Sequence, residues 1–126
     1  MRTASILFVL LAALVVLVNA VAWINGAPLR INALQVGVVA THIALAVLLW
    51  RQVRPAAFIG VVIALAGLLL LTGAIYSMWP LIVGELATSR GAVEFVGTLI
   101  TPTALNLAIV VVLVRALLSN NRWRGP

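Results

Sequence analysis

The sequence contains no cysteine, and its only charged side chains are eight arginines and two glutamates. The absence of cysteine excludes disulfides, thiolate metal sites, iron–sulfur clusters, c-type haem attachment and cysteine nucleophiles within this chain. Charged residues make up 8% of the sequence, whereas a soluble domain carries about a quarter. Hydrophobic residues make up 65%. This balance leaves too little polar surface for a soluble domain and predicts an integral membrane protein.

Four apolar stretches of membrane-spanning length follow one another along the chain. They cover residues 6–22, 31–50, 57–79 and 93–118. Each approaches or exceeds the roughly 20 residues that cross a hydrocarbon core of about 30 Å, and none has a charge in its middle. Helices are the only open-chain structure that satisfies the backbone in lipid. We therefore predict an all-α membrane protein, a four-helix transmembrane bundle that forms a single domain over residues 1–126.

The arginines predict how these helices are oriented. With the N-terminus in the cytoplasm, the cytoplasmic segments carry six arginines and the outer segments carry two, as the positive-inside rule requires. The cytoplasmic set is Arg2, Arg51, Arg54, Arg115, Arg122 and Arg124, and the outer set is Arg30 and Arg90. Tryptophans at or near the span ends, Trp23, Trp50, Trp79 and Trp123, agree with this topology. We expect both termini in the cytoplasm and the protein in a bacterial cytoplasmic (inner) membrane.

Two segments have ambiguous sequence patterns. The first span resembles a secretory signal, with Arg2, an apolar stretch and small residues at 18–20, and we expect it to be retained as a signal anchor. The segment 80–92 is too apolar for a freely solvated loop. It is either an interfacial segment or an extension of the third helix beyond a kink at Pro80. We predict Ser89 as the N-cap of the fourth helix, and Arg90 as the ion-pair partner of Glu85 and Glu94.

Small residues recur on one face of several predicted helices, where membrane helices pack closely. The rows are Ser5, Ala12 and Asn19 on the first helix, Ala33, Gly37 and Thr41 on the second, and Gly60, Ala64, Gly67 and Ala74 on the third, with Ala66, Gly73 and Ser77 opposite. Packing inside the bundle is the simpler interpretation. A surface for self-association or for a partner is the alternative.

His42, the only histidine, lies near the middle of the second span and is a candidate functional residue. It shares a helix face with Gln35. The simplest interpretation is a neutral imidazole that donates to a carbonyl or hydroxyl of a neighbouring helix. As a haem ligand it is a weaker candidate, because one histidine supplies only one axial ligand and a second chain would have to supply the other.

The fourth span is the most polar. Thr98 and Thr101 share a face with Glu94, and Asn106 falls near mid-membrane. Pro102 removes a backbone donor and predicts a kinked or loosened helix. The polar side chains either form a path from the outer surface or bond locally and join two helices. We predict Asn106 and His42 as a buried polar pair.

No motif in the sequence indicates a reaction. Neither glutamate lies at the membrane centre, where proton-coupled transporters place an acid, and His42 has no acid near it in the sequence. Nucleic-acid and nucleotide-binding motifs are also missing. We predict no catalytic or metal-ligating residue, no cofactor other than bound lipid, and His42, Asn106, Thr98, Thr101, Gln35 and Asn19 as buried polar or packing residues.

Two functions remain. The first is a non-catalytic accessory subunit of a larger membrane complex, such as a respiratory or other energy-transducing assembly, with other membrane subunits as partners. The second is a small homo-oligomeric channel or transporter with a polar path along the fourth helix.

Overall fold

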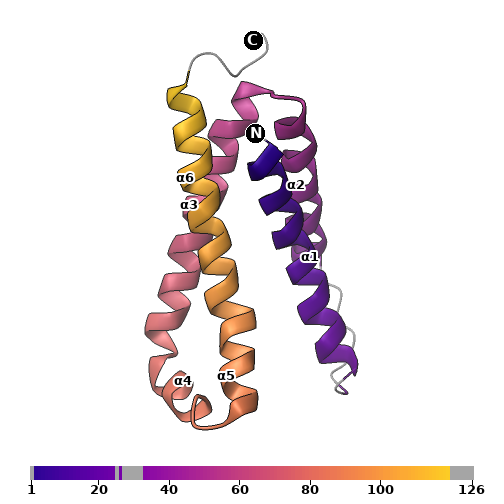
Figure 1. The fold of residues 1–126 in the computed structure, drawn as a ribbon. Helices are drawn as coiled ribbons and strands as arrows, with labels where there is room; N and C mark the ends of the chain where they lie inside the picture. Colours follow the sequence, from indigo (N-terminus) through magenta and orange to yellow (C-terminus); the bar gives the residue numbers. More distant parts are fainter. Residues whose placement is uncertain (1, 25, 27–32, 120–126) are drawn as a thin grey trace.

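The computed structural model describes residues 2–24, 26 and 33–119, and over these residues the chain is helical without strands. Four helices form its body (Figure 1), and two short helices and a π-helical turn complete it. In chain order these are α1 (Arg2–Ile24), α2 (Ala33–Trp50), α3 (Arg54–Ser77), α4 (Trp79–Glu85), α5 (Ser89–Phe95), η1 (Val96–Ile100) and α6 (Thr101–Leu118).

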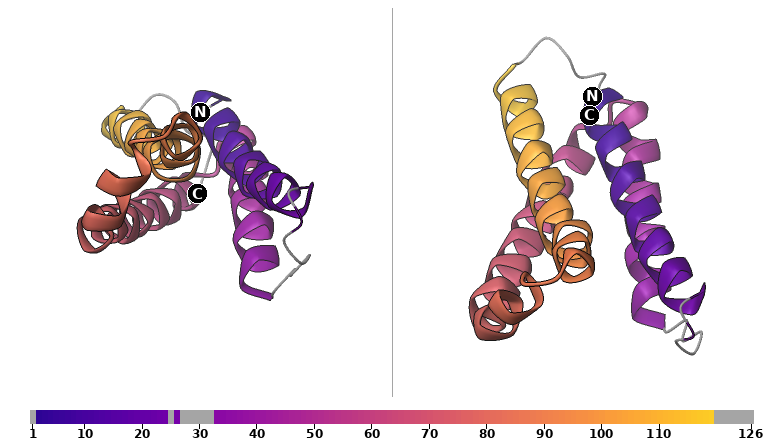
Figure 2. Two further views of the ribbon diagram at one scale, coloured as in Figure 1. Left: turned by 90° about the horizontal axis from the view of Figure 1, so that it is seen from below. Right: turned by 60° about the horizontal axis from the view of Figure 1, so that its bottom comes forward.

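The four long helices are arranged as two antiparallel pairs. The most extensive contacts join α1 to α2 and α3 to α6, and α1 also packs against α6. Contacts between α2 and α3 are few. The pairs meet at the end where α1 begins and α2 ends, and they diverge toward the end that carries α4 and α5 (Figures 1 and 2).

The main cluster of buried hydrophobic residues lies in the half where the two pairs meet, which we call the packed half. It takes residues from the first half of α1, the end of α2, the first half of α3 and the end of α6: Ala4, Phe8, Leu11, Leu45, Ala46, Leu49, Ala56, Ala57, Ala64, Ile109 and Leu113. Phe8, Leu49, Ile109 and Leu113 are its largest fully buried side chains. The first segment of the chain is therefore part of the core.

Among the described residues, three helices are long and apolar enough to cross a membrane, as expected for a membrane protein. They are Arg2–Val21, Arg54–Ser77 and the continuous stretch Ser89–Leu118 through α5, η1 and α6. The predicted second span, 31–50, corresponds to α2, whose apolar stretch Gln35–Trp50 is shorter than the other three.

A tight turn joins α2 to α3. Gln52 has a φ of 60°, in the left-handed region, while the Val53 amide donates to the Leu48 carbonyl at 3.0 Å. This is the hydrogen bond that closes a helix through a left-handed residue, a position that favours glycine. Pro55 then lies in the first turn of α3, where a proline needs no amide partner.

Residues 80–92 neither extend α3 nor form an irregular loop. α3 ends at Ser77, and a separate short helix, α4, begins at Trp79 with Pro80 in its first turn. The fourth span begins at Ser89, earlier than the predicted residue 93. Its N-cap is Thr88, not the predicted Ser89, because the Thr88 hydroxyl accepts a hydrogen bond from the Gly91 amide at 3.0 Å.

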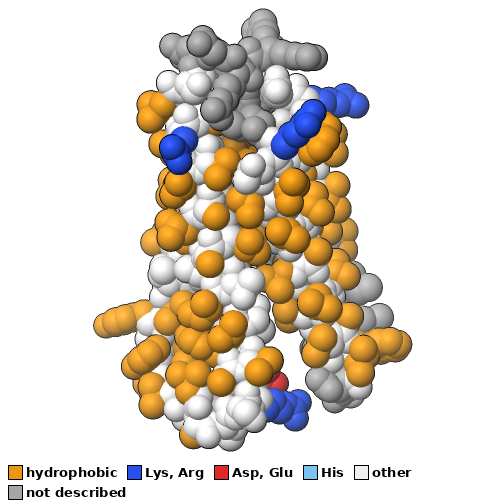
Figure 3. Space-filling view, in the orientation of Figure 1, with side chains coloured by type: hydrophobic (Ala, Val, Ile, Leu, Met, Phe, Trp, Pro, Cys, Tyr) orange, Lys and Arg blue, Asp and Glu red, His pale blue; other side chains and the backbone are white. Residues whose placement is uncertain are grey.

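Charge is distributed unequally between the two ends of the molecule (Figure 3). Arg2, Arg51, Arg54 and Arg115 lie at the ends of helices that meet in the packed half. Arg90 pairs with Glu94 at the opposite end, with 3.2 Å between Nε and Oε1. The predictions for Arg30, Arg122, Trp123 and Arg124 fall outside the described residues, and the predicted pairing of Glu85 with Arg90 does too, because it involves the Glu85 side chain.

Candidate functional site

The predicted row of small and polar residues on α1 faces α2 and provides its hydrogen bonds. The buried Ser5 hydroxyl donates to the Ala46 carbonyl at 2.6 Å, and Ala12 is buried between the helices. Two turns further along, Asn19 Oδ1 accepts from Gln35 Nε2 at 3.2 Å. The spacing of seven residues therefore aligns three contacts along one helix pair.

The Asn19–Gln35 amide pair lies where the two helix pairs diverge. The Asn19 amide also donates to the Val15 carbonyl of its own helix at 2.9 Å. Both amides line an open cleft of about 240 Å³, and Gly97, Thr98 and Pro102 line its other wall. The structure thus brings three of the six predicted polar residues, Asn19, Gln35 and Thr98, to one cleft.

The polar face of the fourth span contains a π-helical turn immediately before Pro102. The Thr101 amide and its hydroxyl both donate to the Val96 carbonyl, five residues back, and the hydroxyl distance is 2.9 Å. Thr98 donates to the Glu94 carbonyl and Thr103 to the Leu99 carbonyl, each at 2.6 Å. The helix is loosened near Pro102, as predicted, and its hydroxyls bond to their own backbone.

Asn106 is buried between α6 and α3 and is 6% exposed. Its amide donates to the Pro102 carbonyl at 2.8 Å. A methyl carbon placed on Gly67 would lie 3.0 Å from Asn106 Oδ1, so this glycine makes room for the amide. The next glycine in the row, Gly60, faces Leu113 and Phe8 at similarly short distances. Three members of the predicted row, Gly60, Ala64 and Gly67, therefore form the α3–α6 interface.

His42 bonds within its own helix, not to a neighbouring one. Its Nδ1 lies 2.7 Å from the Val38 carbonyl oxygen, which can only accept, so the proton is on Nδ1. Its ring meets the Phe8 ring edge-to-face, with 5.5 Å between centroids. The predicted polar pair of His42 and Asn106 is not formed, since each side chain is bonded to a carbonyl of its own helix. At both His42 and Asn106, a backbone carbonyl one turn back in the same helix accepts the hydrogen bond, so no second helix has to supply an acceptor.

The described residues contain no group of three histidine, cysteine or acidic side chains that lie together. The Thr98 and Thr101 hydroxyls and the Asn106 amide donate to carbonyls within five residues of them along the same span. The cleft lined by Asn19, Gln35 and Thr98 therefore presents amide and hydroxyl groups between apolar side chains. Sequence reasoning missed Phe8 and the Asn106–Gly67 contact, although the spacing of Gly60 and Gly67 marked one side of that interface.

Comparison of the chain with protein-family models, with curated proteins and with solved structures finds no match.

Proposed function

We propose that this protein is a non-catalytic accessory subunit of a larger membrane complex, in which partner helices pack against α2 and α3. The observation that carries the proposal is the contrast between two kinds of small-residue row. Some rows are packed inside the chain, and others face no part of it. Small residues provide close approach between helices in lipid, whereas lipid tails place no such requirement on a helix surface.

The packed rows show what such a surface does in this protein. On α3, a methyl carbon added to Gly60 would lie 2.9 Å from Leu113 Cδ1, and Ala64 is fully buried. The row on α1 receives α2 in the same way, through Ser5 and Ala12. In both cases the small side chain is matched by a neighbouring helix in close contact.

The open rows have the same composition and no neighbour within the described chain. Gly37 lies on α2 between the exposed residues Ala33 and Thr41, and nothing lies within 4 Å of a carbon added to it. Gly73 lies on the second face of α3 with the exposed residues Ala66 and Ser77, and it is equally open. These two faces support partner packing on both sides of the molecule.

The arrangement in the membrane belongs to the same proposal. In this proposal α2 crosses the membrane together with the three longer helices, both chain ends lie on the cytoplasmic side, and the membrane is a bacterial cytoplasmic membrane. Support comes from the arginines at one end and the Arg90–Glu94 pair at the other. Because energy-transducing assemblies contain many small apolar subunits without catalytic groups, we propose a complex of that class, such as a respiratory one.

The alternative is a homo-oligomeric channel or transporter. The cleft lined by Asn19, Gln35 and Thr98 favours it, since it holds polar groups between the diverging helix pairs. The hydroxyls of the fourth span weigh against it. Those of Thr98 and Thr101 donate to backbone carbonyls and leave their protons unavailable to a solute.

The experiment uses the absence of native cysteine, which makes single-cysteine variants chemically unambiguous. Gly37→Cys and Gly73→Cys would carry a short photoactivatable crosslinker in native membranes, and Leu65→Cys is the matched control. Leu65 lies on α3 and is 49% exposed, on a different face of the helix from both small-residue rows. The complex is then extracted in gentle detergent and identified by mass.

We expect both glycine positions to crosslink to larger membrane subunits that co-purify in fixed stoichiometry, and Leu65→Cys to crosslink to lipid. Crosslinks from the glycine positions to a second copy alone would favour the homo-oligomer. Equal reaction with lipid at all three positions would disprove the proposal.

A further inference from the structure

An apolar furrow follows the α1–α2 pair along much of its length. It consists of three overlapping open cavities of about 320, 810 and 520 Å³. The first two share Val9 and Ile43, and Val16, Ala20, Val39 and Ile43 join the second to the third. Since each cavity opens into the next, the three form one continuous surface.

The furrow is long enough for the acyl chain of one leaflet. From Ser5 in the first cavity to Trp23 in the third, α1 rises about 27 Å at ~1.5 Å per residue. Half of a hydrocarbon core is about 15 Å, so an acyl chain that starts near Ser5 ends within the furrow. The small residues Ala12 and Ala13 line the furrow along this stretch.

The end of the furrow nearest Ser5 is positively charged. Arg51 and Trp50 line the first cavity, and the Arg2 guanidinium carbon lies 5.3 Å from the centre of the Trp50 ring. Both glutamates of the chain lie in the region of α4 and α5, at the opposite end. Within the part of the chain that the structure describes, Arg2 and Arg51 therefore have no carboxylate to neutralise them.

From this geometry we propose a binding site for an anionic phospholipid. Arg51 and Arg2 hold the phosphate at the membrane surface, and Trp50 lies at the level of the headgroup. One acyl chain lies in the furrow, over Val9, Ala13 and Ile43. Charge complementarity selects the headgroup, because each arginine near the surface attracts an anionic lipid while a zwitterionic headgroup gains less. The site does not depend on which protein partner covers α2 or α3.

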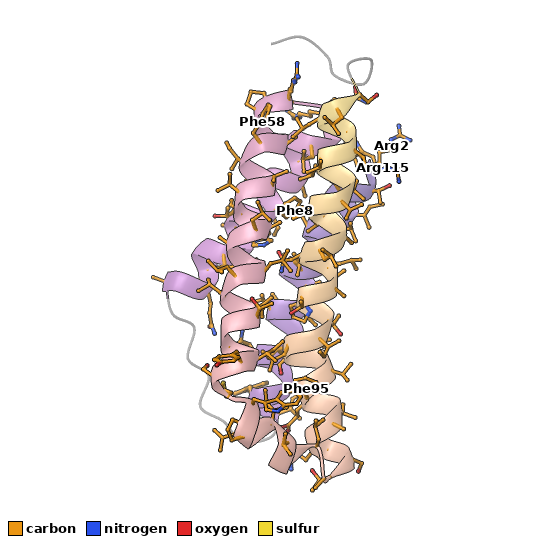
Figure 4. All side chains as sticks on the ribbon, turned by 90° about the vertical axis from the view of Figure 1, so that its left-hand side faces the viewer. Arg2, Phe8, Phe58, Phe95 and Arg115 are labelled. Carbon is orange, nitrogen blue, oxygen red and sulfur yellow. The ribbon has the colours of Figure 1, made fainter. Side chains whose placement is uncertain are left out.

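The test compares two doubly substituted chains that have the same net charge. Arg2→Gln with Arg51→Gln removes the two arginines at the furrow. Arg54→Gln with Arg115→Gln removes two that lie at the same end of the molecule and line none of the three cavities (Figure 4 labels Arg2 and Arg115). The delipidated protein is titrated in neutral detergent with phosphatidylglycerol or with phosphatidylcholine of matched acyl chains, and bound lipid is counted by native mass spectrometry.

We expect the intact chain to prefer phosphatidylglycerol and the furrow variant to lose about fivefold in affinity for each arginine removed, while the control loses less than about twofold. Ala13→Phe, at an exposed apolar position in the furrow, keeps every charge and should weaken both lipids equally. Equal losses in the two arginine variants would show general attraction to the charged end and would overturn the proposal. An unchanged affinity in Ala13→Phe would also overturn it.

Discussion

The two halves of this molecule are built from the same four helices and differ in almost everything else. In the half that carries Arg2 and Arg51, all four helices meet, and the core residues are fully or almost fully buried. In the other half the pairs diverge, and the clefts between them are open. Figure 4 shows the contrast in its labelled aromatic residues, since Phe8 lies within the packed half and Phe95 lies near the opposite end.

The difference follows from the kinds of contact available in each half. Alanine and glycine allow the helices of the packed half to approach closely, as at Ala57 and Gly60. The open half has fewer buried small residues, and it joins α1 to α2 through the Asn19–Gln35 amide pair. Because lipid tails are as apolar as the side chains, close packing rather than water exclusion holds membrane helices together. Stability is therefore concentrated where packing is closest.

The largest expected effect comes from removing an aromatic ring in each half. Phe8→Ala leaves a cavity among fully buried neighbours and should lower the free energy of unfolding by about 3 kcal/mol. Phe95→Ala removes the same side chain from a half-buried position in the open half and should cost about 1 kcal/mol. Unfolding in mixed micelles, followed by circular dichroism, measures both. Equal costs would erase the distinction between the halves.

Replacing a glycine of α3 by a larger residue also distinguishes closely packed positions from open ones. Gly60→Leu places a side chain against Leu113 and Phe8 and should destabilise the fold by about 2 kcal/mol. At Gly73, on the same helix, an added Cβ meets no atom within 4 Å, so Gly73→Leu should not lower the free energy of unfolding of the isolated chain. In native membranes, however, Gly73→Leu should reduce recovery of the proposed complex. A Gly60→Leu chain as stable as the parent would mean that the interface near Gly60 can shift to accept the larger side chain.

The turn between α2 and α3 offers a smaller effect of opposite sign. Gln52→Gly relieves a left-handed residue and should stabilise the protein by about 1 kcal/mol. Gln52→Ala is the control, because it shortens the side chain and keeps the backbone cost. Stabilisation by both variants would locate the effect in the side chain and not in the backbone.

The smallest effect concerns the amide pair of the open half. A double-mutant cycle with Asn19→Leu and Gln35→Leu should give a coupling energy of about 0.6 kcal/mol, typical of polar pairs between membrane helices. Ser5→Ala, which removes a bond to a buried carbonyl in the packed half, is the comparison. A coupling energy near zero would show that the pair contributes nothing to the divergent half.

The membrane character and the helix positions could be predicted from the sequence because apolar length is a strong signal. The first small-residue rows of α1 and α3 lie on packing faces, as predicted, and the structure shows that they meet α2 and α6. The spacing of residues along a helix determines which of them share a face, so this face can be identified without knowing which helix packs against it. The simpler interpretation, packing inside the bundle, does not hold for the row on α2 or for the second row on α3, where the positions of Gly37 and Gly73 are open within the described chain.

Polar partners could not be predicted in the same way. Asn106 is buried and His42 is half-buried, and at each position a carbonyl one turn back is the hydrogen-bond partner of the side chain. Sequence spacing shows which helix face carries a polar group and not which acceptor it will find. The Thr88 cap was missed by one residue, because Thr88 and Ser89 carry equivalent hydroxyls and only the backbone at Thr88 is extended.

The π-helical turn Val96–Ile100 has a consequence for changes in chain length. A turn of this kind accommodates one residue more than an α-helix would over the same rise. Deleting Gly97, whose position has open space around it, would convert the turn to regular α-helix and leave the faces of α5 and α6 in their present registers. A deletion at Ala108, by contrast, would rotate Ile109 and Leu113 about 100° relative to Asn106 and turn them out of the core. The fourth span thus has one place where its length can change by a residue without a change in what it presents to its neighbours.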